Sequence, residues 1–164
     1  MGSEMCIRDS PYTGAFASLG AEDHRAVEEA AERAGVTALL EVPATDLSGG
    51  QRQRVWVAMT VAQQTPVLLL DEPTTYLDPA HQIAILDLVR DLNSAGRTVV
   101  MVVHDMTHAA RFADSIVAMR DGQVLAAGET EDVMSAKLVE DLFGISCLEV
   151  RDPETGRTLP IPYR

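Results

Sequence analysis

Residues 67–78 read VLLLDEPTTYLD and residues 98–105 read TVVMVVHD, and these two stretches decide the fold class. Each opens with a short continuous apolar run, which is typical of a strand buried on both faces of a parallel sheet. Between them, residues 79–94 carry apolar side chains at helical spacing, and Gly96 follows as a helix terminator. The pattern therefore predicts a strand–helix–strand unit of an α/β fold.

The flanking sequence predicts further helices and one hairpin. An Ala- and Glu-rich stretch, residues 21–34, and a stretch opening at Ser48, residues 48–64, both have helical periodicity. In the second of these helices we expect Val55, Met59 and Ala62 to line the buried face and Trp56 to pack in the core. Residues 121–122 are Asp-Gly between apolar runs, which indicates a hairpin. Helices are expected from residue 105 to about 112 and over 130–143, and the tail from 146 alternates only weakly.

Composition narrows the class of protein. The 164 residues include 13 Lys+Arg and 25 Asp+Glu, for a formal net charge of −12, and 46% are hydrophobic. The length suits one globular domain with a sizeable core, and the acidic balance disfavours nucleic acid as a partner. No apolar run approaches the roughly 18 residues of a spanning helix. Cys6 and Cys147 have no metal-binding spacing, so a reducing compartment is expected.

Polar side chains follow both predicted strands at the point where each strand ends. Asp71 and Glu72 come directly after the first run, and His104 comes directly after the second. Ligands of open α/β sheets bind outside the carboxyl ends of the strands, so we expect these three side chains to converge on one crevice. A carboxylate pair there suits a hydrated Mg²⁺ and a base that orients water. Chance polarity where strands meet loops is the alternative for any one of them.

A second candidate site opens the helix at residues 47–51, LSGGQ. Gly49 and Gly50 would let a phosphate approach the backbone, and the helix N-terminus offers free N–H groups. Ser48 adds a hydroxyl. A serine-capped helix after a glycine turn is the alternative, and it is common.

The order of these motifs resembles that of ATP-binding-cassette (ABC) ATPases. Residues 47–51 resemble the family's signature motif, residues 67–72 its Walker B strand, residues 75–78 its D-loop, and His104 its switch histidine. Three segments are similar to the sequences of the ATPase subunits of iron–siderophore importers: TTYLDPAHQ, HDMTHAARFAD and LVEDLFGISC. Importers of cobalamin, haem and other metal chelates are close alternatives. The resemblance covers residues 11–164.

The resemblance implies the C-terminal part of an ABC-type P-loop ATPase domain, with a helical subdomain and a partial parallel sheet with flanking helices. Residues 11–65 would form the helical subdomain and residues 66–164 the distal part of the ATPase core with a C-terminal segment. Residues 1–10 share no periodicity with the rest, and we expect an artefact or a disordered leader there.

The family's functional residues carry over by position. The resemblance implies that Asp71 holds Mg²⁺, that Glu72 is the general base for the attacking water, and that His104 senses the γ-phosphate. It also implies that Asp78 links two sites across a dimer. The residues that would meet ATP bound on a second subunit are Ser48, Gly49, Gly50 and Gln51.

The implied protein is an ATP-binding and ATP-hydrolysing importer subunit with ATP and Mg²⁺ as cofactors. Its expected partners are membrane permease subunits and a second ATPase subunit in a homodimer, without nucleic acid. Its expected place is the cytoplasmic face of the inner (plasma) membrane, as a peripheral subunit.

One departure from the family is clear. ABC ATPases carry a phosphate loop, GxxxxGK[ST], whereas the only lysine here is Lys137, preceded by Ala136. We therefore expect a fragment that alone binds ATP weakly and hydrolyses it negligibly, with an exposed apolar edge on its sheet. The alternatives are a short cassette protein that has lost catalysis and acts as a binding partner, and a cassette protein of DNA repair or ribosomes.

Overall fold

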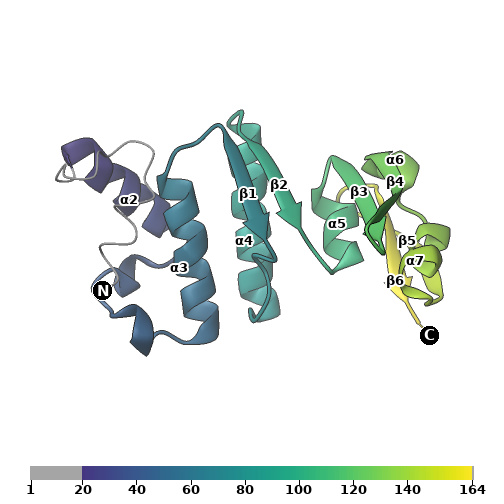
Figure 1. The fold of residues 1–164 in the computed structure, drawn as a ribbon, viewed down its shortest axis with the longest axis horizontal. Helices are drawn as coiled ribbons and strands as arrows, with labels where there is room; N and C mark the ends of the chain where they lie inside the picture. Colours follow the sequence, from purple (N-terminus) through teal and green to yellow (C-terminus); the bar gives the residue numbers. More distant parts are fainter. Residues whose placement is uncertain (1–19, 164) are drawn as a thin grey trace. The chain divides into compact units, whose positions relative to one another are not determined.

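The computed structural model describes residues 20–163, which belong to two compact units divided between Val102 and Val103 (Figure 1). The elements of the first unit are α2 (Ala21–Arg33), η1 (Thr37–Leu39), η2 (Ala44–Asp46), α3 (Gly49–Ala62), β1 (Val67–Asp71), α4 (Pro79–Ser94) and β2 (Thr98–Val102). Those of the second are α5 (Met106–Phe112), β3 (Ser115–Arg120), β4 (Gln123–Glu129), α6 (Thr130–Val133), α7 (Ala136–Phe143), β5 (Cys147–Arg151) and β6 (Thr158–Pro162). The predicted leader, residues 1–10, lies outside the described residues.

The predicted strand–helix–strand unit is present. Strands β1 and β2 pair in parallel, with Val67 opposite Thr98 and Asp71 opposite Val102. Helix α4 connects the two strands. It begins after Asp78 because the Asp78 side chain caps its start and a proline is favoured in its first turn. Gly96, with φ at 90°, turns the chain out of the helix and into β2. The α/β class expected from the two apolar runs is therefore confirmed.

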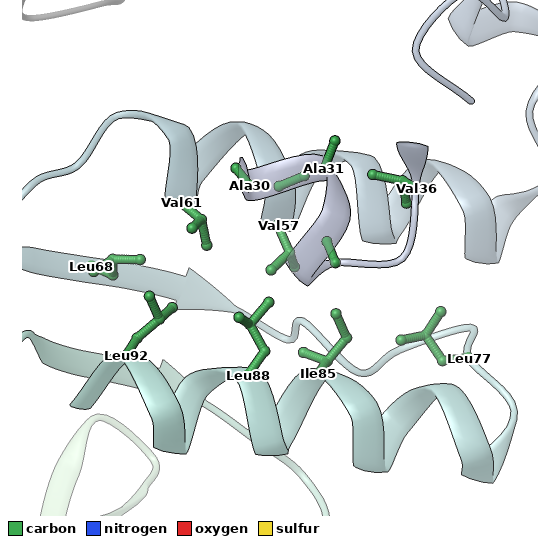
Figure 2. Packing of buried hydrophobic residues seen from close by; sticks show 12 residues of the cluster. Ala30, Ala31, Val36, Val57, Val61, Leu68, Leu77, Ile85, Leu88 and Leu92 are labelled. Carbon is green, nitrogen blue, oxygen red and sulfur yellow. The ribbon is translucent and has the colours of Figure 1, made fainter. Parts of the chain in front are cut away.

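The core of the first unit lies between α2, α3, α4 and one face of β1. Leu68 is 1% exposed and packs with Val57 and Val61 of α3 and with Leu88 and Leu92 of α4 (Figure 2). Burying one such leucine contributes roughly 1.5–3 kcal/mol. Strand β1 and helices α2, α3 and α4 share one core. The first unit therefore contains both the helices predicted for the helical subdomain and the β1–α4–β2 unit. The subdomain division at residue 65 remains a prediction.

The other face of the β1–β2 sheet is exposed. Leu69 is 72% exposed and Val100 is 54% exposed, and Val67 and Val102 share this exposure. The expectation that both faces of these strands are covered is therefore wrong for the described residues. Side chains alternate along a strand, and the described helices pack on only one of the two faces that a continuous apolar run creates. The sequence predicted exposed apolar residues at an edge of the sheet, whereas these exposed apolar side chains lie on one of its faces.

The buried face of α3 agrees only in part with the predicted one. Val55 and Ala62 are partly buried and pack against the core, as expected, whereas Met59 is 40% exposed and Trp56 is 56% exposed. The fully buried side chains of the helix are Val57, Ala58 and Val61. Polar and apolar residues are spread around this helix without one clear apolar side, so its periodicity alone does not select the face that packs. The expected core position of Trp56 is wrong.

The second unit contains the predicted hairpin and one that was not predicted. Asp121 and Gly122 both have positive φ, 51° and 75°, as a two-residue turn between β3 and β4 requires. Strands β5 and β6 form a further antiparallel hairpin from the weakly alternating tail.

The expected helix over residues 130–143 is interrupted. It divides into α6 and α7, because Ser135 is extended and its Oγ accepts a hydrogen bond from the Leu138 amide at 3.2 Å. This side chain caps α7, and a capped start requires a non-helical residue.

Candidate functional site

The two acidic residues lie at the carboxyl end of β1, as predicted. Asp71 is the last residue of the strand, and the Glu72 amide donates a hydrogen bond to the Val102 carbonyl at 3.1 Å. The Asp71 side chain is exposed and that of Glu72 is half-buried. The end of the parallel pair therefore presents one carboxylate to solvent and holds the next residue against the neighbouring strand.

Glu72 adopts an unusual backbone conformation. Its φ is 47°, in the left-handed region that residues with a side chain rarely occupy. Its carbonyl oxygen accepts hydrogen bonds from the Thr75 amide at 3.2 Å and from Gln53 Nε2 at 3.0 Å. The Thr75 hydroxyl donates to Glu72 Oε2 at 3.0 Å. Both the backbone and the carboxylate of Glu72 are thus held by named partners.

The helix start at residues 48–51 is closed by reciprocal hydrogen bonds. The Gln51 amide donates to Ser48 Oγ at 3.2 Å, and the Ser48 amide donates to Gln51 Oε1 at 2.9 Å. This capping box fixes the first turn of α3. The Ser48 hydroxyl accepts in this pair, and its own proton is not used in that bond.

The glycines of this motif also pack against the loop after β1. A Cβ on Gly50 would lie 3.3 Å from the Tyr76 carbonyl oxygen and 3.3 Å from Leu77 Cδ2. A Cβ on Gly49 would meet Tyr76 Cβ at 3.9 Å, an ordinary contact. Sequence reasoning assigned both glycines to phosphate approach, and the packing role of Gly50 was missed.

Asp78 is the N-cap of α4. Its Oδ1 accepts the His81 amide at 3.0 Å, and its Oδ2 lies 2.6 Å from His81 Nδ1. The hydrogen bond from the His81 amide, together with the bond to its ring, lowers the pKa of the Asp78 carboxyl from its usual value. His81 is a partner that sequence reasoning left without a role, although its position three residues after a cap predicts the amide contact.

His104 is the second residue of the second unit and lies directly before Asp105, which caps α5. Asp71 and Glu72 belong to the first unit. The convergence of the three side chains therefore stays a prediction.

The donor set is consistent with Mg²⁺ held largely by water and phosphate oxygens. Within residues 20–163 no group of three or more His, Cys, Asp or Glu side chains could enclose a metal ion. Mg²⁺ in phosphoryl-transfer sites takes only one or two protein carboxylates. The exposed Asp71 at the strand end has the chemistry of such a ligand, and its metal role remains a prediction. The single lysine, Lys137, lies in α7 and pairs with Asp141 at 3.1 Å.

The described helices include none that is both long and apolar enough to cross a membrane.

The sequence matches the ABC transporter family model over residues 3–75. It is 47% identical over 154 residues to the petrobactin import ATP-binding protein FpuD of Bacillus anthracis, which covers 93% of this chain and 56% of the relative. It is 41% identical over 153 residues to the ferric enterobactin transport ATP-binding protein FepC of Escherichia coli, again over 93% and 56%. The chain thus spans about half the length of these curated relatives.

Solved structures give the same result for the fold. A transporter described as of the metal-chelate ABC type, in an inward-facing conformation, matches with a TM-score of 0.83 and 27% identity over 98% of this chain and 66% of that chain. The dimeric MJ0796 cassette bound to ADP and Pi matches with a TM-score of 0.63 and 33% identity, over 70% and 50%. The folded chain thus resembles part of an ATP-binding cassette.

Proposed function

Because this chain is homologous to the ATP-binding subunits of ABC transporters and has the fold of the C-terminal part of their ATPase domain, we propose that it serves ATP-driven uptake of iron–siderophore chelates. The observation that carries the proposal is the identity of 41–47% to siderophore-transport ATPases over 93% of the chain. The ordered motifs at residues 47–51, 67–78 and 104 lie within the same chain.

The strand-end carboxylates would carry the chemistry. Asp71 would hold Mg²⁺, which neutralises phosphate charge when bound. Glu72 would orient the attacking water and accept its proton, and the Thr75 hydroxyl at 3.0 Å fixes the carboxylate for that task. His104 would contact the γ-phosphate.

The site we propose is shared between two copies. The N-terminus of α3 would meet the γ-phosphate of ATP bound on the second subunit, through the residues Ser48, Gly49, Gly50 and Gln51. The free N–H groups and the positive end of the helix dipole support an anion there. Asp78 would link the two sites of this homodimer.

The remaining partners follow from the importer role. The dimer would bind membrane permease subunits as a peripheral protein at the cytoplasmic face of the plasma membrane and would drive them by closing on ATP. Nucleic acid is not a proposed partner, in keeping with the net charge of −12.

Haem and cobalamin are the alternative cargoes. The hemin import ATP-binding protein HmuV of Rhodococcus jostii is 41% identical over 143 residues, and the cobalamin import ATP-binding protein BtuD of Halobacterium salinarum is 41% identical over 157 residues. Five siderophore or iron-chelate relatives reach 45–47% identity, one of them over only 100 residues, and FepC reaches 41%; the higher values favour the ferric chelate.

An uptake assay tests the role and the cargo together. Glu72→Gln is introduced into the gene, and cells are supplied with radiolabelled ferric siderophore, haem or cobalamin under iron limitation. We expect Glu72→Gln to abolish uptake of the ferric siderophore and to leave uptake of haem and cobalamin unchanged. The control Glu131→Gln, at an exposed glutamate of α6, should leave siderophore uptake unchanged. Normal siderophore uptake in the Glu72→Gln strain would overturn the proposal.

A turnover assay tests the expectation that the chain alone is inactive, and uptake together with co-purification distinguishes an ATPase subunit from an inactive binding partner. We expect the purified chain alone to hydrolyse ATP negligibly, because its sequence holds no GxxxxGK[ST] loop. Turnover that Glu72→Gln abolishes would contradict that expectation. Normal uptake with Glu72→Gln, together with co-purification with a permease, would favour the inactive binding partner.

A further inference from the structure

We propose that Gln53 is a positioning residue, which holds Glu72 in its left-handed conformation and links the start of α3 to the carboxylate in the same chain. The bond that carries this inference runs from Gln53 Nε2 to the Glu72 carbonyl oxygen at 3.0 Å and is partly buried. The inference deepens the proposed ATPase role and rests on it for its functional meaning.

Glu72 needs external support for its backbone. A residue with a side chain at φ 47° is strained, and it keeps that conformation only where the surroundings over-determine it. The Thr75 amide bond to the Glu72 carbonyl belongs to the same turn. The Gln53 bond comes from a different helix, 19 residues earlier in the chain, so it ties the turn to α3.

The loop after β1 is held from the other side by a second glutamine. Gln82 of α4 donates from Nε2 to the Thr74 carbonyl at 3.4 Å and to the Leu77 carbonyl at 3.1 Å. Two side-chain amides therefore fix the carbonyls at both ends of residues 72–77. The two helices that carry these amides contribute to one core, so these hydrogen bonds tie the loop to that core.

Gln53 lies on the same helix as the proposed ATP-contacting residues, two positions after Gln51. The close approach of Gly50 to the Tyr76 carbonyl gives a second contact between the same helix turn and the same loop. A shift of the α3 start on meeting a phosphate would therefore reach Glu72 through Gln53. This arrangement couples the start of α3, which would contact ATP bound on the second subunit, to Glu72, the proposed general base of the same chain.

The test uses isotope-labelled full chain and needs no nucleotide. Gln53→Met removes the amide donor at similar length, Gln53→Lys keeps an N–H donor, and Gln63→Met, at the end of α3, is the matched control. The readouts are hydrogen exchange of the Thr75 amide, the carbonyl ¹³C shift of Glu72, and unfolding in urea.

We expect Gln53→Met to accelerate exchange of the Thr75 amide by roughly threefold to tenfold, the scale of one lost hydrogen bond, and to shift the Glu72 carbonyl resonance. Gln53→Lys should restore both readouts, and Gln63→Met should change neither.

Unchanged Thr75 exchange and an unchanged Glu72 resonance in Gln53→Met would overturn the proposal. Equal acceleration at all amides would also overturn it, because it would show global destabilisation without a local tie. If Gln53→Met does not fold, Gln53→Asn, which keeps the amide but is one methylene too short, is read in the same way. These outcomes do not depend on iron uptake, so failure of the transport role is recognised separately.

Discussion

Gly50 and Tyr76 approach so closely that a Cβ on the glycine would lie 3.3 Å from the tyrosine carbonyl oxygen. The contact joins the first turn of α3 to the loop that follows β1. A backbone carbonyl cannot rotate aside as the end of a flexible side chain can. The packing of the chain itself therefore favours a glycine at the second glycine position of the motif, independently of any phosphate.

Replacement of the two glycines by alanine should separate these roles. Gly50→Ala introduces a contact at 3.3 Å and should lower the free energy of unfolding by about 1 kcal/mol or more relative to Gly49→Ala. Gly49→Ala meets Tyr76 Cβ only at 3.9 Å and serves as the matched control. Urea denaturation of both variants measures the difference, and equal stabilities would contradict the packing role.

Neighbouring leucines of β1 should respond very differently to truncation. Leu68 is 1% exposed within the core, so Leu68→Ala should lower the free energy of unfolding by about 2–5 kcal/mol. Leu69 faces the exposed side of the sheet, and Leu69→Ala should cost less than about 1 kcal/mol. Urea denaturation provides the comparison. Similar losses for the two variants would mean that the exposed face is covered in solution.

The exposed apolar face of the β1–β2 sheet should promote self-association. Its members are Val67, Leu69, Val100 and Val102. Such a face on a short sheet with unpaired strands is an aggregation site, so Leu69→Lys should raise the monomer fraction. Sedimentation velocity over a concentration series measures that fraction. Leu40→Lys, at an exposed leucine outside the sheet, is the control, and equal effects of the two variants would argue against this face.

Acid should destabilise the second unit through Asp152. This buried carboxylate accepts the Thr155 hydroxyl at 2.7 Å and lies 3.2 Å from Arg111 Nε. The hydrogen bond from the Thr155 hydroxyl contributes most to lowering the pKa of Asp152 below its usual value. The hydrogen bond from the Glu154 amide and the positive charge of Arg111 lower this pKa further.

The sign of the effect follows from that lowered pKa. Between the folded and unfolded pKa values the unfolded chain binds more protons, so the stabilisation is complete above the unfolded value and is lost as the pH falls through the folded one. We expect Asp152→Asn to flatten the loss of stability below about pH 4. Thermal unfolding across pH 2–7, with Asp121→Asn at an exposed turn as control, measures this, and an unchanged profile would refute it.

Local patterns in the sequence were sufficient for several elements. The apolar runs at β1 and β2, the spacing within α4 and the Asp-Gly turn are each complete within a few residues, and each formed as predicted. The order of the motifs along the chain could likewise be identified from the sequence alone. It placed Asp71 and Glu72 at a strand end without any knowledge of packing.

Features that depend on partners distant in the chain could not be read in this way. The continuous helix expected over 130–143 failed because a serine cap competes with helix continuation, and the tail hairpin formed from a weak pattern through pairing of β5 with β6. The buried face of α3 was decided by α2 and α4, since its own sequence has no single apolar side.

The sequence alone determined the α/β class, the order of motifs and the position of the acidic pair, because these depend on periodicity and adjacency. Only the tertiary structure decided that Gln53 holds Glu72, that Gly50 accommodates Tyr76, and that one face of the β1–β2 sheet is exposed. Those relationships arise when elements separated along the chain pack together, and a side chain's neighbours across such a contact leave no periodic trace in the sequence.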